Sequence, residues 1–283
     1  MRAAMSSGRR LAFVSPGLLR CARGDIGSFM PLRLTPGDML ARVLYRDGLM
    51  LVVDKPAGIP VHRGPKGGHA FEDYFDALRY GLPRPPALAH RLDKDTSGCL
   101  VLGRHRKALA HLGLLFKHNK VRKTYWAVVE GGPAEDEGLI DIPLGRLNET
   151  RGWWMKPDPN GLPSQTTWKV MGRGKADDGK ELTWLALEPV TGRTHQLRVH
   201  CAAKGFPIVG DNIYGTAPQF GGPVMNLHAR EIVVPLSKNK PPVTVVAPLP
   251  AHMRERMTAC GWNEASGGDQ VAAVVPGEAG GQE

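Results

Sequence analysis

The chain has 283 residues, of which 42% are hydrophobic and 23% charged, a balance typical of a folded protein and not of a disordered one. It carries 37 lysines and arginines against 27 acidic residues, a net charge of +10. Such an excess favours a polyanionic partner, because a positive surface potential attracts phosphates and binding releases their counterions. No apolar stretch approaches the roughly 18 residues of a membrane-spanning helix, so we expect no membrane partner.

The cysteines and histidines show neither a disulfide framework nor a metal site. Four cysteines stand at positions 21, 99, 201 and 260 without a C-x-x-C spacing, and Cys99 and Cys201 lie in apolar surroundings typical of small core residues. This usage fits a reducing compartment, so we expect a cytoplasmic protein. Gly174 to Lys180 resembles a phosphate-binding loop, but Glu181 follows where a serine or threonine is needed. A zinc site and a nucleotide-binding loop therefore have little support.

The two ends of the chain differ in composition from its middle. The first 24 residues contain five arginines and no Asp or Glu. Such segments occur in organelle transit peptides, in disordered basic arms and where a start codon is placed too early. We favour the last two, and expect residues 1–35 to form a poorly ordered basic arm. From Gly261 the chain turns to Gly, Ala, Glu and Gln, so we expect a folded domain at 36–255 and a disordered tail at 256–283.

The first folded elements are predicted to be a hairpin and two helices. Val43 to Arg46 and Leu49 to Asp54 have the pattern of strands, and Asp47-Gly48 between them is a strong hairpin signal. Residues 71–80 are predicted to form a helix with acidic residues in its first turn. Residues 104–118 are the clearest helix, because their apolar residues fall on one stripe.

Strands dominate the rest of the chain. They are predicted over 123–130, 166–171, 182–187, 231–235 and 243–247. A helix is predicted over 194–204, with Thr194 as its N-cap and Gly205 after its end. Strands joined by hairpins, with few helices between them, predict an α+β fold: a mixed, mostly antiparallel central sheet with flanking helices and an active-site cleft across the sheet.

The run from His90 to Gly98, His-Arg-Leu-Asp-Lys-Asp-Thr-Ser-Gly, is the strongest sign of chemistry. It lies between the prolines of 83–86 and the apolar run 99–102, which indicates an irregular loop that leads into a buried strand. Asp93, held in such a loop beside the guanidinium of Arg91, is a candidate nucleophile or base. The residue types alone also fit a solvated ion pair or an Asx-turn.

A second signal is the aromatic pair Tyr125-Trp126, in a strand that follows several basic residues. Neighbouring strand residues point to opposite faces, so one ring can face the core while the other faces a site. Aromatic rings stack on nucleobases and contribute roughly 1–3 kcal/mol per base. For this spacing alone, core or edge packing of both rings is the commoner outcome.

The third signal is the run from Thr191 to His200, TGRTHQLRVH. Gly192 and the helix start that follows it can form an anion-binding corner of outward-pointing backbone N–H groups, and Arg193 and Arg198 add positive charge. A helix here could bring Arg198 beside Asp93, where a guanidinium would stabilise the charged carboxylate and fix its rotamer. The spacing does not establish that contact.

Together these runs resemble the motifs of the RluA family of pseudouridine synthases. The loop matches the pattern H-R-L-D-x-x-T-S-G at every fixed position, and Lys123 to Ala127 matches K-x-Y-x-A. Gly192 to His200 matches G-R-T-H-Q-L-R-x-H, and Gly210 to Gly215 resembles G-D-x-x-Y-G. The resemblance runs from about Val43 to Val246, with the motifs in order.

The resemblance implies that specific uridines of structured RNA, either large-subunit ribosomal RNA or transfer RNA, are isomerised to pseudouridine. The enzyme would extrude the uridine from its strand, at a cost of a few kcal/mol. Asp93 would be the nucleophile, Tyr125 would stack on the base and Arg198 would pair with Asp93. We assign substrate binding to His90, Arg91, Thr96, Arg193 and Leu197. No metal or cofactor is implied, and we expect a monomer whose partner is RNA.

Two features depart from the family pattern. The roughly 40 residues before the motifs are too few for the small RNA-binding domain that many relatives carry, so RNA choice is expected to rest on the catalytic domain. Trp153-Trp154 lies in an unmatched stretch, where packing against the sheet is favoured over stacking on RNA. Two rival functions stay open: a non-catalytic RNA-binding or ribosome-assembly protein, and a nucleoside or glycoside hydrolase that uses Asp93.

Overall fold

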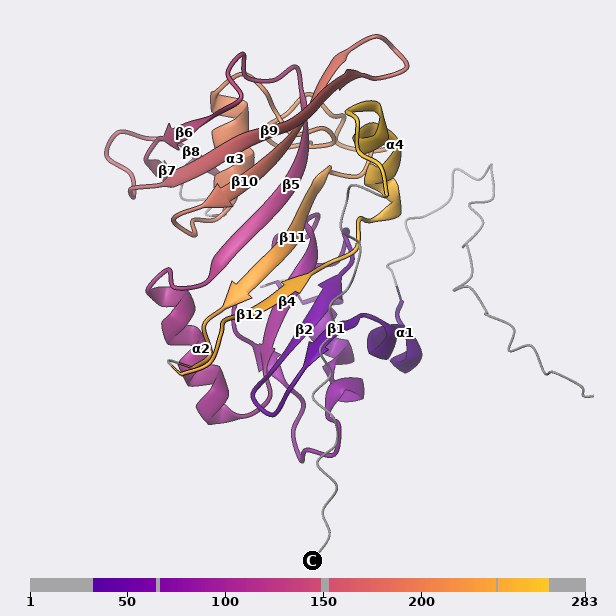
Figure 1. Cartoon of the computed structure of the whole chain (residues 1–283), viewed down its shortest axis with the longest axis vertical. Helices are drawn as coiled ribbons and strands as arrows, with labels where there is room; N and C mark the ends of the chain where they lie inside the picture. Colours follow the sequence, from indigo (N-terminus) through magenta and orange to yellow (C-terminus); the bar gives the residue numbers. More distant parts are fainter. Residues whose placement is uncertain (1–32, 65–66, 149–152, 238, 265–283) are drawn as a thin grey trace, which may run out of the picture. The chain divides into compact units, whose positions relative to one another are not determined.

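A ten-stranded sheet organises the part of the chain that the computed structural model describes, residues 33–64, 67–148, 153–237 and 239–264 (Figure 1). The expected basic arm, apart from residues 33–35, and the tail from residue 265 lie outside the described residues. The strands of the sheet are β1 (Val43–Arg46), β2 (Met50–Lys55), β3 (Ala87–Leu88), β4 (Ser97–Gly103), β5 (Arg122–Glu130), β6 (Glu137–Asp141), β9 (Gln165–Lys175), β10 (Glu181–Pro189), β11 (Leu227–Val234) and β12 (Val243–Val246).

The order of strands along the sheet is β1-β2-β4-β11-β5-β10-β9-β6, with β3 paired to β4 and β12 paired to β11. Neighbouring strands are antiparallel, except that β4 and β11 run parallel. A separate two-stranded sheet pairs β7 (Leu144–Arg146) with β8 (Met155–Pro157). The mixed, mostly antiparallel sheet of an α+β fold is thereby confirmed.

Four α-helices and one 3₁₀ helix accompany these strands in the described residues. They are α1 (Pro36–Ala41), η1 (Phe71–Leu78), α2 (Arg106–Lys117), α3 (Gln196–Ala203) and α4 (Ala251–Ala259). The helix predicted over 71–80 is of the tighter 3₁₀ type, and ends two residues early. No helix among the described residues has the length and apolar character needed to cross a membrane.

The predicted hairpin is present, and its turn has a side-chain cause. β1 and β2 pair antiparallel, and the Asp47 carboxylate accepts hydrogen bonds from the backbone N–H groups of Leu49 and Met50, both at 2.7 Å. An Asp that binds the backbone two residues onward forms an Asx-turn. β2 continues into Lys55, which contacts the loop before β4.

A glycine determines how closely β4 approaches β11. Gly98 has φ +104°, and a Cβ built on it would lie 2.3 Å from the carbonyl oxygen of Ala229. Only glycine fits both that backbone conformation and that spacing. The neighbouring pair adds a side-chain bond, because Ser97 Oγ and His228 Nδ1 are 2.9 Å apart. The start of β4, where the loop that carries Asp93 ends, is therefore fixed against β11 in the sheet.

The folded part of the chain continues beyond the predicted boundary at residue 255. Helix α4 runs to Ala259, and its Met253 and Met257 are completely buried. Trp262, after the helix, is also buried, at 5% exposure. The expectation of disorder was wrong for residues 256–264, because two methionines four residues apart and a tryptophan cover the sheet around Trp184 and Val128. Patterns of so few apolar residues do not predict a helix.

Tyr125 lies between two apolar clusters of the core. One cluster includes residues of β2, β4, η1 and α2, and the other includes residues of β10 and α3. Tyr125 packs against both from its place on β5. Strand β5 lies in the middle of the sheet (Figure 1), and Tyr125 on this strand lies between the two clusters.

Candidate active site

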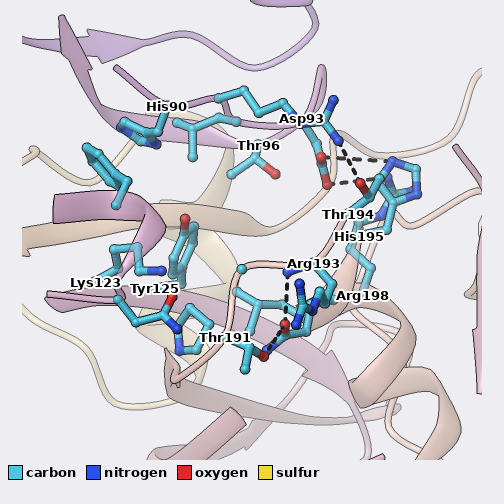
Figure 2. Close-up of a pocket in the computed structure, with 18 of the residues that line it drawn as sticks. His90, Asp93, Thr96, Lys123, Tyr125, Thr191, Arg193, Thr194, His195 and Arg198 are labelled. Carbon is cyan, nitrogen blue, oxygen red and sulfur yellow. Dashed lines mark hydrogen bonds and ion pairs between the residues drawn. The ribbon is translucent and has the colours of Figure 1, made fainter. Parts of the chain in front are cut away.

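The predicted site residues surround one cavity of about 640 Å³ (Figure 2). This volume falls within the roughly 300–1,000 Å³ of small-molecule sites. The lining contains all eight of them, His90, Arg91, Asp93, Thr96, Tyr125, Arg193, Leu197 and Arg198. The fold thus joins three motifs that are far apart in the sequence: the loop before β4, the strand β5 and the start of α3.

Lys55 holds the loop that carries Asp93 through hydrogen bonds to its backbone. The Lys55 side chain is completely buried, and its Nζ donates hydrogen bonds to the carbonyl oxygens of Pro56, Lys94 and Thr96, each at 2.9 Å. Burial lowers the pKa of Lys55 to about 7. Sequence reasoning missed this residue, although a lysine at the end of an apolar strand, followed by proline, is an unusual position for a charged side chain.

Arg198 has two carboxylate neighbours, and Asp93 is the more distant. Arg198 Nε and Nη2 each donate to Asp211, both at 2.7 Å, whereas Nη1 lies 3.9 Å from Asp93 Oδ2. The predicted pair of Arg198 with Asp93 therefore exists only as this looser contact. The bidentate partner is Asp211, because its loop brings its carboxylate against the guanidinium edge of α3.

Asp211 is among the least exposed charged residues of the described chain. Its side chain is 1% exposed, and it also accepts hydrogen bonds from the backbone of Ile213 and Tyr214. Burial by itself would raise the pKa of Asp211, but the bonds from Arg198 and from the backbone outweigh burial and hold the pKa below its usual value. The sequence contains the motif G-D-x-x-Y-G at this position, but nothing in its spacing indicates that Asp211 pairs with Arg198.

His195 is the second neighbour of Asp93. Its Nε2 lies 3.9 Å from Asp93 Oδ1, and its Nδ1 lies 2.9 Å from the hydroxyl of Tyr214. Burial lowers the pKa of His195, and the nearby Asp93 opposes that effect. Helix α3 begins at Gln196 with His195 as the N-cap residue, so the predicted N-cap Thr194 was wrong. Thr194 instead accepts a hydrogen bond from Arg91 Nη2 at 2.6 Å.

The two rings of the aromatic strand point to opposite faces, as the pleat of a strand requires. Tyr125 lines the cavity, while Trp126 packs edge-on against Trp184 with ring centroids 4.9 Å apart. The guanidinium of Arg230 lies 4.3 Å from the centre of the Trp126 ring. Burial, with Asp93 nearby, raises the pKa of the Tyr125 hydroxyl, so the phenol stays protonated at neutral pH.

His90 and Thr96 line the cavity, but their contacts hold the loop. His90 Nε2 accepts a hydrogen bond from the backbone of Val101 at 3.0 Å, and its ring stacks on Phe116 at 4.4 Å between centroids. Burial lowers the pKa of His90 to about 3. The Thr96 backbone N–H donates to the Asp93 carbonyl oxygen at 3.2 Å. These contacts hold the loop that carries Asp93 in place.

Basic and apolar groups occupy different parts of the cavity. Arg91 and Arg193 are exposed, and Lys123 is half-buried. Leu197 belongs to the buried core beneath α3. The loop before α3 is fixed by Gln196, which accepts hydrogen bonds from the Arg193 backbone at 3.0 Å and from the Thr191 hydroxyl at 2.7 Å. Positive charge is therefore available where a phosphate backbone could approach.

Two further expectations concern residues beyond the cavity. Trp153 is 59% exposed, so its predicted packing against the sheet was wrong for this residue; the preceding residues 149–152 lie outside the described part. Among the described residues, no group of three or more His, Cys, Asp or Glu side chains could hold a metal ion.

Comparison with known proteins identifies the family. The family described as RNA pseudouridylate synthase matches residues 49–203, which include all three motifs of the cavity. The chain belongs to the RNA pseudouridylate synthase family. It is 42% identical over 211 residues to an uncharacterised RNA pseudouridine synthase of Zymomonas mobilis, covering 74% of this chain and 94% of that protein.

More distant relatives agree with this assignment. The ribosomal large subunit pseudouridine synthase C of Vibrio cholerae is 37% identical, over 76% of this chain and 68% of its own length. The dual-specificity RNA pseudouridine synthase RluA of Vibrio vulnificus is 36% identical, over 70% and 79%. The solved structure of human RNA pseudouridylate synthase domain containing 1 superposes with a TM-score of 0.63 at 30% identity, covering 77% of this chain and 86% of that one.

These matches confirm the predicted family and enzyme class. The protein is an RluA-type RNA pseudouridine synthase, an isomerase that acts on uridine in RNA. Family membership favours this activity over the two rival functions, a non-catalytic RNA-binding protein and a small-substrate hydrolase.

Proposed function

We propose that this pseudouridine synthase extrudes a specific uridine from structured RNA into the cavity and uses Asp93 as its nucleophile. One observation carries the proposal. Asp93 lines a nucleoside-sized cavity with one carboxylate oxygen 3.9 Å from His195 and the other 3.9 Å from Arg198. A carboxylate flanked by donors, only 24% exposed and open to a cavity, is arranged for nucleophilic attack.

The reaction rearranges one glycosidic bond without net change in composition. Asp93 forms a transient covalent bond to the nucleotide, and the bond between ribose C1′ and uracil N1 breaks. The uracil turns in the cavity and C5 bonds to C1′. The hydrogen on C5 leaves as a proton, N1 gains one, and Asp93 is released as a carboxylate.

The other residues of the cavity bind the base, stabilise the charge of Asp93 and contact the RNA backbone. Tyr125 stacks on the extruded uracil, and its protonated hydroxyl can relay the proton that leaves C5 by passing its own proton to solvent as it accepts the new one. Arg198 stabilises the carboxylate charge from a position fixed by Asp211. Leu197 supports the base from the apolar side. Arg91 fills the vacated position in the strand or holds a flanking phosphate, and Arg193 adds a second phosphate contact.

The substrate we propose is large-subunit ribosomal RNA or transfer RNA. Two relatives carry the names ribosomal large subunit pseudouridine synthase C and dual-specificity RNA pseudouridine synthase. The net charge of +10 suits a polyanion, and it predicts that affinity falls as salt is raised. We also propose that the enzyme acts as a monomer in the cytoplasm and needs no cofactor.

A comparison of cellular RNA with and without the gene tests this function. Pseudouridines are mapped in total RNA of both strains, and purified protein is then added to the RNA of the deletion strain. A site that is lost in the deletion and restored by the protein identifies the substrate. If no site is lost or restored, or if free uracil is released instead, the proposal is wrong.

A further inference from the structure

His195 has an uncommon backbone conformation that the capping of helix α3 does not explain. It is one of three non-glycine residues with positive φ in the described chain, at φ 52°. As the N-cap residue of α3 it makes no side-chain capping bond. A left-handed conformation is uncommon for residues other than glycine, although histidine adopts it more readily than most, and such positions cluster at functional sites. In this backbone conformation the His195 ring lies beside Asp93 and does not cap the helix (Figure 2).

A short chain of hydrogen bonds favours one of the two neutral tautomers of the His195 ring. The backbone N–H of Met155 donates to the Tyr214 hydroxyl oxygen at 2.9 Å. The other neighbour of that oxygen is Nδ1 of His195, at 2.9 Å, and a hydroxyl that already accepts from Met155 is well placed to donate to it. An Nδ1 that accepts leaves the hydrogen of a neutral imidazole on Nε2. Nε2 is the nitrogen that faces Asp93.

Charged groups surround this ring from several elements. Arg91 from the nucleophile loop and Arg198 from α3 oppose its protonation, whereas Asp93 and Asp211 favour it. Burial has the largest effect and lowers the pKa of His195, so the ring is neutral at pH 7. A neutral ring with hydrogen on Nε2 is a hydrogen-bond donor toward Asp93, not a second cation.

Arg198 cannot orient the nucleophile alone, because two of its nitrogens bind Asp211 at 2.7 Å and one faces Asp93 at 3.9 Å. We propose that His195 is a positioning residue that donates from Nε2 to Asp93 Oδ1 and, with Arg198 on Oδ2, sets the plane of the carboxylate for attack. The inference rests on the proposed role of Asp93. The separation of 3.9 Å shortens when substrate fills the cavity, as catalytic hydrogen bonds commonly do.

Substitution of His195 by asparagine or by glutamine tests its two ring nitrogens separately. Asparagine places a polar group near the position of Nδ1 and tolerates the left-handed backbone, but it does not reach Asp93. Glutamine reaches the position of Nε2 and can donate there. We expect His195→Asn to keep its contact with Tyr214 and lose the donor, and His195→Gln to restore the donor.

Single-turnover kinetics measure the effect. The probe is total RNA from the deletion strain, labelled with tritium at uridine C5, which is released as pseudouridine forms. We expect His195→Asn and Tyr214→Phe to lower the maximal rate by about 10- to 100-fold, the range that misplacement of a reacting group produces. The enzyme concentration at half-maximal rate should stay unchanged, and His195→Gln should recover most of the rate.

The outcomes separate this inference from the proposed function. If the wild type is active and His195→Asn reacts as fast as the wild type, the positioning role is wrong while the proposed function stands. The same holds if the wild type is active and His195→Gln recovers none of the rate that His195→Asn loses. No tritium release by the wild type overturns the proposed function and this role with it. Nitrogen-15 NMR of the full chain tests the tautomer without RNA, with His195→Gln to assign the signal. Hydrogen on Nε2 supports the inference, and hydrogen on Nδ1 overturns it.

Discussion

Arg198 and Asp211 form a buried bidentate ion pair, with both N–O distances at 2.7 Å and both side chains at most 3% exposed. Asp93 lies on the third nitrogen of the same guanidinium, at 3.9 Å. Asp211 thus occupies two of the donors of Arg198 and fixes the direction of the third. Asp211, far from Asp93 in the sequence, thus determines how Arg198 approaches the proposed nucleophile.

The first prediction concerns Asp93. Asp93→Asn keeps the shape of the side chain but removes the nucleophile, so RNA affinity should persist while the single-turnover rate falls at least about 1,000-fold, as for other essential nucleophiles. Tritium release and filter binding measure the two quantities. Asp95→Asn, the same change two positions along the loop, should keep most of the activity. Turnover near wild type in Asp93→Asn would contradict the proposed mechanism.

The second prediction concerns the buried pair. Asp211→Asn leaves the Arg198 charge without its partner, so the free energy of unfolding should fall by about 3–5 kcal/mol and the rate should fall with it. Urea unfolding measures the loss. The control is Asp136→Asn, which breaks a 3.0 Å pair with Arg173 in which Asp136 is 89% exposed. That change should alter stability by less than about 1 kcal/mol. Equal losses in the two variants would argue against a dominant role for burial.

The third prediction concerns the contact between β4 and β11. Gly98→Ala forces a Cβ to within 2.3 Å of the Ala229 carbonyl oxygen at a φ of +104°, and it should destabilise the protein by at least about 2 kcal/mol. Gly113→Ala offers a matched test, because Gly113 lies inside α2 with no heavy atom within 4 Å of the added Cβ. It should stabilise the protein by about 0.5–1 kcal/mol. Thermal unfolding of the two variants should shift in opposite directions.

The fourth prediction concerns acid stability. Burial lowers the pKa of His228 to about 3, from a usual value of 6.5. Between these values the unfolded chain binds the extra proton, so this contribution to stability is complete above about pH 6.5 and is lost progressively as the pH falls toward 3. His228→Gln should therefore flatten the decline in urea stability between pH 7 and 5.

Ile232→Val is the control for the histidine, because it weakens the same strand without adding or removing a titrating group. Its stability should decline with pH as steeply as that of the wild type. An unchanged slope in His228→Gln would show that this histidine does not govern the acid response.

Local sequence determined the elements whose cause is local. The Asp47-Gly48 turn, the apolar stripe of α2 and the alternation of Tyr125 and Trp126 depend on neighbours within a few residues, and all three appear as predicted. The motifs in their order also determined the family, since each fixed position of the loop around Asp93 matches. Helix α4 was missed because its two buried methionines contact strands far away in the sequence.

Only the tertiary structure decided how the site is held. The motifs predicted a pair of Arg198 with Asp93, but they did not show that Asp211 is the closer partner. The partner of a guanidinium depends on distance and burial in the folded chain, and the spacing of residues in the sequence gives neither. The contacts of Lys55 and His195 could not be predicted from the sequence for the same reason. Lys55 binds the carbonyl oxygen of its neighbour Pro56 and those of two residues in the loop that carries Asp93, and His195 faces Asp93 from a left-handed backbone position. Hydrogen bonds and ion pairs act over a few ångströms of space, so their partners become known only when the chain is folded.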